Sequence, residues 1–187
     1  MEELQYEVEK RNEKLTELED MLNQKDQMMK SLKKAVSDAL LGFESSELTV
    51  THRDGKIYVS LEEKLLFKTG SWSVDPRGVE AITSLARVLQ ENPNINVMIE
   101  GHTDNVPYRS NGKQIQDNWD LSVKRATSIV RILLKNSSID PTRITAAGRG
   151  EYFPVDAANT PAARKKNRRT EIILAPDYSK LYNLIGE

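Results

Sequence analysis

The sequence predicts an α/β protein (an α+β sandwich) in which a long N-terminal helix leads into a β-hairpin and a βαβαβ-type two-layer unit. Three observations support this prediction. The first 41 residues contain no glycine or proline and carry apolar residues at helical spacing. An Asp54-Gly55 turn lies between two alternating segments. After it, short alternating segments and longer amphipathic segments follow one another along the chain.

The composition excludes several classes of protein. The 187 residues include 27 basic and 28 acidic side chains, so the net charge of -1 demands no polyanionic partner. Cysteine is absent, which excludes a disulfide framework and thiolate metal sites. We find no signal peptide at Met1 and no apolar segment near the ~20 residues that a spanning helix needs. We expect no cofactor.

The N-terminal helix, residues 1–41, has a heptad pattern. Its a positions are Val8, Leu15, Leu22, Met29 and Val36, and its d positions are Leu4, Arg11, Leu18, Lys25, Leu32 and Ala39. Two d positions are cationic, which weakens a tight dimer. A solitary solvated helix or a cropped stalk remains an alternative, but the length of the pattern favours a coiled-coil homodimer. At ~1.5 Å per residue such a helix is roughly 55 Å long.

A second unit is expected at residues 45–176, followed by a C-terminal tail, residues 177–187, with room for a short helix. The hairpin strands carry Leu48 and Val50, then Ile57, Val59 and Leu61. Helices are predicted after Asp75-Pro76, from about Asn118 to Lys135 and from Pro161. The intervening strands contain Ile95 to Ile99, Ile144 to Ala146, and Ile172 to Leu174. Strands separated by helices need crossover connections, so we expect at least one parallel pair with helices on one face.

Two charged residues form a candidate binding site. Asp104 lies just past a predicted strand, and Arg125 lies on the flank of the buried face of the helix that follows. A guanidinium binds a carboxylate through two parallel hydrogen bonds, and a carboxylate binds an ammonium, so the two side chains suit a zwitterion such as an amino-acid head group. The alternative is that Asp104 and Arg125 simply pair with each other. Spacing alone does not decide between them.

Three motifs in this order resemble the OmpA-like peptidoglycan-binding domain, the family of OmpA C-terminal domains, Pal lipoproteins and MotB. They are Ile99-Glu100-Gly101-His102-Thr103-Asp104, Leu121-Ser122-Val123-Lys124-Arg125-Ala126 and Asn167-Arg168-Arg169-Thr170-Glu171-Ile172. The resemblance covers roughly residues 57–176. It implies non-covalent binding of the cell-wall stem peptide through its diaminopimelate residue.

The resemblance also implies a role for individual residues. Asp104 would accept the ligand's ammonium, Arg125 would clamp its carboxylate, and Asn118 would add a hydrogen bond. Backbone groups of two short segments would line the pocket, and two further residues would support the binding loops. These are Thr69, Gly70, Asn105 and Val106 for the lining, and Asn167 and Arg168 for the support.

Two features depart from the family pattern. The first pocket loop has the sequence Leu66-Phe67-Lys68-Thr69-Gly70-Ser71. Many members carry Phe-Asp or a close variant at its start, so with Lys68 here the role of a side-chain acid is lost. The loop at residues 106–116 is longer than in compact members and is similar to the MotB-type branch. The pocket rim is therefore expected to be specific to this protein.

Other chemistries have little support in the sequence. The basic run at residues 164–169 lacks interleaved aromatic side chains, which argues against nucleic-acid binding. His102 has no third metal ligand in view, so no metal site is predicted. No nucleophile and base can be assembled, because Ser122 has no histidine nearby in the sequence. We expect no enzymatic activity.

These observations predict a non-catalytic module that binds peptidoglycan in the periplasm of a diderm bacterium. It would be cell-wall associated and tethered to the outer or inner membrane by an anchor outside this chain. An alternative is a MotB-like stator component, in which cell-wall binding anchors an ion-driven motor. A cell-wall hydrolase is a third alternative, for which no catalytic residues are present.

Overall fold

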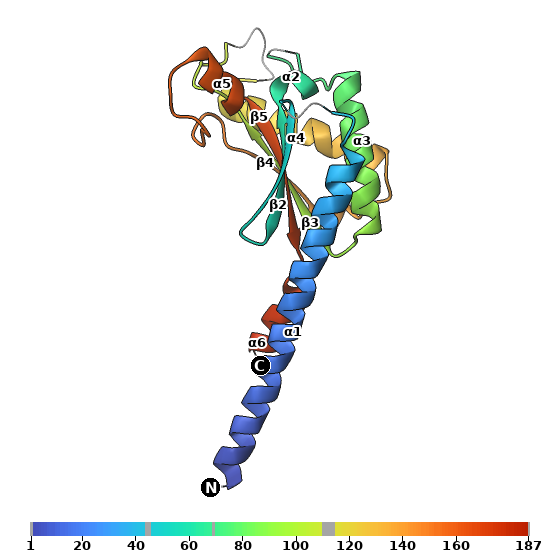
Figure 1. The fold of residues 1–187 in the computed structure, drawn as a ribbon. Helices are drawn as coiled ribbons and strands as arrows, with labels where there is room; N and C mark the ends of the chain where they lie inside the picture. The colour runs from blue at the N-terminus through green and yellow to red at the C-terminus, as the bar shows by residue number, and fades with distance from the viewer. Residues whose placement is uncertain (1, 44–45, 69, 110–114, 187) are drawn as a thin grey trace.

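The computed structural model describes residues 2–43, 46–68, 70–109 and 115–186. It contains one five-stranded sheet with the strand order β1-β2-β5-β3-β4 (Figure 1). The strands are β1 (Leu48–Arg53), β2 (Lys56–Glu62), β3 (Ile95–His102), β4 (Ile144–Gly148) and β5 (Arg169–Pro176). Neighbouring strands are antiparallel except β3 and β4, which are parallel. The predicted α/β class and its parallel pair are confirmed.

The hairpin turn explains why β1 and β2 pair in register. Asp54 and Gly55 both have positive φ angles, of 51° and 69°. Two consecutive positive values define the turn whose twist matches that of the flanking strands. Leu48 therefore lies opposite Leu61, and Val50 lies opposite Val59.

The helices begin where the sequence indicates capping. They are α1 (Glu2–Ala39), α2 (Glu63–Leu66), α3 (Pro76–Glu91), α4 (Asn118–Lys135), α5 (Pro161–Asn167) and α6 (Ser179–Gly186), with a single 3-10 turn, η1 (Pro141–Arg143). The carboxylate of Asp75 caps α3 by accepting the backbone N–H of Arg77 at 3.3 Å. Asp117 caps α4 in the same way, accepting from Asp120 at 3.0 Å. The four-residue helix α2 has no sequence signal of its own and was not predicted.

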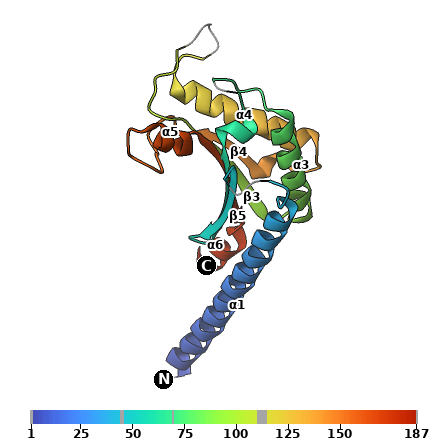
Figure 2. The ribbon, with the colours of Figure 1, turned by 45° about the horizontal axis from the view of Figure 1, so that its top comes forward.

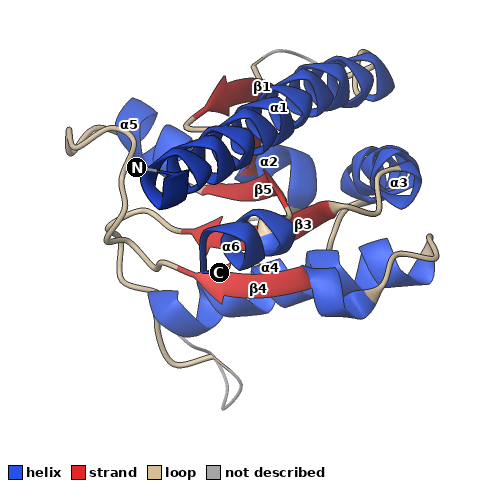
Figure 3. Ribbon diagram, turned by 90° about the horizontal axis from the view of Figure 1, so that it is seen from below, coloured by secondary structure: helices blue, strands red, loops and turns tan. Residues whose placement is uncertain are grey.

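One face of the sheet is covered by helices, and the other is largely open. Helices α3 and α4 pack on the first face together with the end of α1 nearest the domain (Figures 2 and 3). Alternate strand residues such as Ile57, Val59, Ile99 and Ile172 point into this core. The remaining strand positions face away from it, and loop residues 149–155 cover one end of that open face.

Helix α1 differs along its length. At its N-terminal end the heptad positions Leu15 and Leu22 are about half exposed, at 56% and 49%. Nearer the domain, Met29 and Val36 are buried, at 1% and 0%, in the same hydrophobic cluster as the sheet. The N-terminal part of α1 extends away from the sheet, with α6 beside it (Figures 1 and 3). Part of the predicted coiled-coil seam is thus occupied by the chain's own domain.

None of the described helices combines the length and the apolar character needed to cross a membrane.

Candidate functional site

Asp104 and Arg125 are both brought to the end of the sheet where β3 and β5 meet the loops. Asp104 follows β3 by two residues and is 8% exposed, and its Oδ1 accepts the backbone N–H of Val106 at 3.0 Å. Arg125 lies in the second turn of α4. At 2% exposure, its side chain is part of the buried face of that helix, whereas the sequence placed it on the flank.

Asp104 and Arg125 do not pair directly. Arg168 donates from Nη1 to Asp104 Oδ2 at 2.6 Å and from Nε to Glu63 Oε2 at 2.6 Å. The second oxygen of Glu63 accepts from Arg125 Nη2. The result is a sequence of alternating charges, Asp104–Arg168–Glu63–Arg125, which we call the four-charge chain. Neither the simple pair nor two isolated charges describes the site.

The four-charge chain is electrically balanced and partly shielded from water. Glu63 is 9% exposed, whereas the side chain of Arg168 is 32% exposed and is the more accessible of the two guanidiniums. Burial lowers the pKa of Arg168, but its hydrogen bonds and charge interactions with Asp104 and Glu63 outweigh this and raise it above its ordinary value. Arg168 therefore remains a cation in the site.

Arg125 is fixed by contacts on several sides. Its Nε donates to the backbone carbonyl of Ser71 at 2.9 Å. The guanidinium carbon lies 5.0 Å from the centre of the Phe67 ring, a cation–π geometry. These contacts tie α4 to the first pocket loop, so a change in that loop changes the surroundings of Arg125.

Other predicted residues lie around the same loops. Asn118 donates to the carbonyl of Val106 at 3.0 Å and to Glu151 Oε2 at 2.8 Å. Asn105 donates to Asn159 Oδ1 at 3.2 Å. Asn118 thus holds the loop that follows Asp104, and Asn105 joins that loop to the one preceding α5.

The first pocket loop also contains two of the predicted lining residues. Gly70 has a φ angle of +69°, a backbone conformation that other residues rarely adopt. Thr69 lies outside the described residues, as do residues 110–114 of the long loop.

The two predicted supporting residues differ in position. Asn167 Oδ1 accepts the N–H groups of Val155 and Asp156 at 2.9 and 3.1 Å, and its Nδ2 donates to the carbonyl of Asp156 at 2.8 Å. Asn167 therefore holds the loop before α5. Arg168 lies within the four-charge chain itself.

Glu63 is the residue that sequence reasoning missed. An acid does enter the site, although Lys68 occupies the position where the family pattern places one. A signal was present, because Glu63 continues the every-second-residue register of Ile57, Val59 and Leu61, all of which face the core. A carboxylate at a core-facing position requires a partner.

A second group of charges lies on the open face, and it corrects the expectation that His102 has no further candidate ligands nearby. Glu100, His102 and Glu171 offer ligand atoms within 4.8 Å of one another. Both carboxylates are already held by guanidiniums: Arg149 donates to Glu100 and Arg169 donates to Glu171, each at 2.9 Å. We call these five residues the open-face cluster.

His102 is the neutral member of the open-face cluster. It is 1% exposed, and its ring nitrogens make no hydrogen bond to the described residues, although Nε2 lies 3.2 Å from Glu100 Oε1. Burial, followed by the charges of Arg169 and Arg149, lowers the pKa of His102 to about 3. The imidazole is uncharged at neutral pH.

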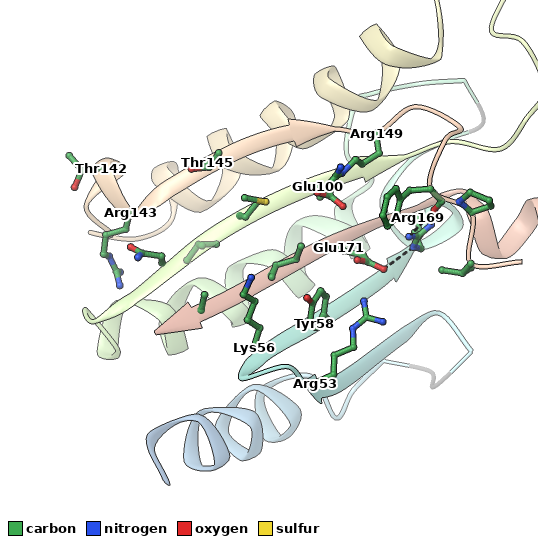
Figure 4. A pocket seen from close by; sticks show the side chains of 18 residues that line it. Arg53, Lys56, Tyr58, Glu100, Thr142, Arg143, Thr145, Arg149, Arg169 and Glu171 are labelled. Atoms are coloured by element: carbon green, nitrogen blue, oxygen red, sulfur yellow. Dashed lines mark hydrogen bonds and ion pairs between the residues drawn. The ribbon is translucent and has the colours of Figure 1, made fainter. Parts of the chain in front are cut away.

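The open-face cluster adjoins a cavity of about 950 Å³ between the β1–β2 hairpin and β4 (Figure 4). Arg53, Lys56, Arg143 and Arg149 line its rim, with Glu100 and Glu171 at one end. Arg143 is committed to the fold, since its Nη1 donates to the carbonyls of Asn92 and Ile95 at 2.7 and 2.8 Å. This cavity contains none of the residues of the four-charge chain.

Ser122 has a structural role. Its hydroxyl donates to the carbonyl of Trp119 at 2.8 Å and accepts the N–H of Gly150 at 3.1 Å. It lies where α4 packs tightly on the sheet, because a Cβ on Gly101 would lie 2.2 Å from the Ser122 carbonyl oxygen. Both hydrogen-bonding functions of the hydroxyl are thus used within the fold.

Fold and site together define a class: a two-layer α/β domain with a group of ion-paired charges at the strand ends. Residues 66–168, more than half of the chain, match the OmpA family. The chain belongs to the OmpA family.

Relatives of known name agree with this assignment. Motility protein B of Bacillus subtilis is 33% identical over 120 residues, which are 64% of this chain and 45% of that protein. The chain therefore spans less than half of that relative. A MotB-like protein from Desulfovibrio vulgaris shares the fold with a TM-score of 0.76 at 23% identity, covering 83% of this chain and 96% of that one.

A third similar structure is the cell wall anchor of the type VI secretion system from Pseudomonas aeruginosa. It has a TM-score of 0.67 at 26% identity and covers 75% of this chain and 96% of that one.

Proposed function

We propose that this chain is a non-catalytic module that binds peptidoglycan through the diaminopimelate of the stem peptide and so anchors an envelope component to the cell wall. The observation that carries the proposal is the four-charge chain, placed at the strand ends of an OmpA-family domain. Its alternation of charges matches a zwitterion, which brings one ammonium and one carboxylate. The cell-wall anchor of Pseudomonas aeruginosa supports the same role.

The four-charge chain suggests how the ligand would enter. The ammonium would bind Asp104, and the carboxylate would first meet Arg168, the more exposed guanidinium. Arg125 is buried behind Glu63, so a ligand carboxylate reaches it by replacing the Glu63 carboxylate. The site remains electrically balanced, because the ligand brings one ammonium and one carboxylate, and the displaced Glu63 carboxylate keeps its hydrogen bond from Arg168.

The test is co-sedimentation with purified sacculi. Asp104→Asn and Arg125→Lys should each weaken retention about ten- to hundredfold, the effect of losing a charge-assisted hydrogen bond of about 1.5–3 kcal/mol. Asp20→Asn, on the exposed surface of α1, is the matched control. Circular dichroism would verify that the variants fold. Undiminished retention of both site variants would refute the proposed site.

The ligand's carboxylate offers an independent test. A stem peptide whose diaminopimelate side-chain carboxylate is amidated should bind more weakly, because the guanidiniums then face a neutral group. Calorimetry with the free and amidated peptides measures this difference. Equal affinities would exclude the arginine clamp.

A second candidate function is a MotB-like role, in which the same binding anchors a motor. The similarity to Motility protein B and to the Desulfovibrio MotB-like fold favours it. It predicts a membrane-spanning helix with an acidic residue upstream of Met1 in the full-length gene product. Sequencing the gene upstream distinguishes this role from a lipoprotein-like one.

We place the domain in the cell envelope, outside the inner membrane, tethered by a segment outside this chain. The named relatives from Bacillus subtilis and Escherichia coli include motility proteins and a probable lipoprotein, which supports such a location.

We also propose a homodimer through the N-terminal part of α1, where Leu4, Val8, Leu15 and Leu22 remain exposed. Leu15→Lys with Leu22→Lys should convert a dimer to a monomer in sedimentation equilibrium. Leu41→Lys alters a residue that is 78% exposed and outside this stripe, so it should have no effect. A wild-type chain that is monomeric throughout the concentration range would contradict the dimer.

A further inference from the structure

A second cavity adjoins the four-charge chain. Described residues from the end of β2, from α2 and the segment that follows it, and from the end of α5 and the residue after it line a cavity of about 510 Å³. Glu63 and Arg168 form part of its wall, so the cavity and the four-charge chain share two charged side chains. Asp104 and Arg125 lie outside its lining. A group bound here would be a neighbour of the ligand at the four-charge chain.

The cavity has more cations than carboxylates. Four cations line it: Lys64, Lys68, Lys165 and Arg168. The three carboxylates are Glu62, Glu63 and Asp75, so the cavity holds one more cation than it holds acids. A single carboxylate would balance that excess, whereas a doubly charged phosphate would exceed it.

The carboxylates of the cavity already have partners. Glu62 lies 3.3 Å from the ammonium of Lys165, Glu63 is held by two arginines, and Asp75 caps α3. Among the described residues, Lys64 and Lys68 form no ion pair. The unmatched positive charge therefore lies on the side of the cavity formed by α2 and the first pocket loop.

Arg168 has one guanidinium nitrogen that can donate a hydrogen bond to a group in the cavity. Its Nε and Nη1 bind Glu63 and Asp104, whereas its Nη2 makes no hydrogen bond to the described part of the chain. A carboxylate in the cavity would accept from this Nη2, and the ammonium groups of Lys64 and Lys68 line the same cavity. We propose that the cavity is a second carboxylate subsite, which binds a carboxylate next to the diaminopimelate in the same peptide. This inference rests on the proposed function and extends it to the neighbouring residue of the ligand.

Three probes separate the subsite from the primary site. The tripeptide alanyl-γ-glutamyl-diaminopimelate has a free glutamyl α-carboxylate beside the diaminopimelate, because the peptide bond uses the γ-carboxyl group. Its counterpart with that α-carboxylate amidated lacks the charge. Free diaminopimelate has no glutamyl residue and therefore measures binding at the four-charge chain without the glutamyl α-carboxylate. The dissociation constant of each probe is measured by calorimetry.

The wild-type chain should bind the free tripeptide about tenfold more tightly than the amidated one. Lys64→Gln combined with Lys68→Gln removes the two cavity cations that have no ion pair with the described residues, so it should bring this ratio close to one and leave the affinity for free diaminopimelate unchanged. Lys166→Gln is the control, since Lys166 lies in the neighbouring helix α5, pairs with Asp156 at 3.2 Å and does not line the cavity. The control should keep the wild-type ratio.

The outcomes distinguish the two proposals. If free diaminopimelate binds but the double variant keeps the wild-type ratio, or the wild-type ratio is already one, the subsite is refuted and the primary site stands. If no probe binds the wild-type chain, both are refuted. Loss of the ratio in Lys166→Gln as well would show a general effect of surface charge and would also overturn the subsite.

Discussion

The four-charge chain and the open-face cluster each contain two carboxylates and two guanidiniums, yet they are built differently. In the open-face cluster, Arg169 and Glu171 are neighbours on one face of β5, and Glu171 is the register partner of Glu100 on β3. The sheet therefore fixes the positions of these side chains. In the four-charge chain, Glu63 and Arg168 each serve two partners, and the residues come from the ends of elements and from a helix.

This difference separates a structural group of charges from one that suits a ligand. Like charges opposite each other across two strands destabilise a sheet. In the open-face cluster, Arg149 and Arg169 offset the repulsion between Glu100 and Glu171. In the four-charge chain, a ligand carboxylate can replace Glu63 at Arg125, and Glu63 still keeps its ion pair with Arg168. Arg168 and Arg169 are adjacent in the sequence, yet Arg168 belongs to the four-charge chain and Arg169 to the open-face cluster.

The largest expected effect is on stability and distinguishes these two arginines. Arg169→Gln should lower the free energy of unfolding by roughly 3–5 kcal/mol, because it leaves the buried Glu171 carboxylate without its ion-pair partner. Arg168→Gln should cost only about 1 kcal/mol, since its side chain is about one-third exposed, Glu63 keeps Arg125, and Asp104 keeps the hydrogen bond from the N–H of Val106. Urea denaturation measures both. Equal losses would remove the distinction between the two groups of charges.

The second effect is a pH dependence that belongs to the open-face cluster. Burial first, then the charges of Arg169 and Arg149, lowers the pKa of His102 from 6.5 to about 3. The unfolded chain therefore binds a proton below pH 6.5 that the folded chain does not bind until about pH 3. Between pH 6.5 and about pH 3, His102 therefore lowers the free energy of unfolding as the pH falls, by about 1.4 kcal/mol per pH unit.

Denaturation curves from pH 7 to pH 4 isolate this contribution. The slope of the wild-type chain should exceed that of His102→Gln by the amount given above. A slope shared by the two chains would show that carboxylates alone determine the acid sensitivity.

The smallest effect concerns ligand exchange at the four-charge chain. Glu63→Gln removes the carboxylate that a ligand must displace from Arg125, so affinity for free diaminopimelate should rise about three- to tenfold, at most about 1.4 kcal/mol. Glu100→Gln, the corresponding change in the open-face cluster, should leave affinity unchanged. Calorimetry measures both variants. Weaker binding by Glu63→Gln would mean that Glu63 orients Arg125 for the ligand and does not compete with it.

Much of the fold could be predicted because its signals are local. The Asp54-Gly55 turn, the Asp75 cap and the alternation in β3 each depend on a few consecutive residues, and the elements form where these residues predict them. The heptad of α1 shows the limit of such reasoning. A stripe of apolar residues indicates that a helix face is covered, but Met29 and Val36 pack on the chain's own domain.

The site was predictable in its residue types but not in its pairing. Asp104 and Arg125 lie at the same end of the sheet, as expected, yet they are linked through Glu63 and Arg168, which are 105 residues apart. No local pattern encodes a contact over that separation. Glu63, just after β2, continues the core-facing alternation of that strand, but only the folded positions of α4 and of Arg168, the residue after α5, show which cations it meets.

Helix α1 joins the domain through buried side chains, and this has a mechanical consequence. Met29, Leu32, Val36 and Leu40 belong to the same hydrophobic cluster as the sheet. A pull along the helix axis would load these contacts in shear, and a twist of the helix would turn the domain with it. A domain bound to the cell wall would therefore transmit both tension and torque to helix α1 as one stiff unit.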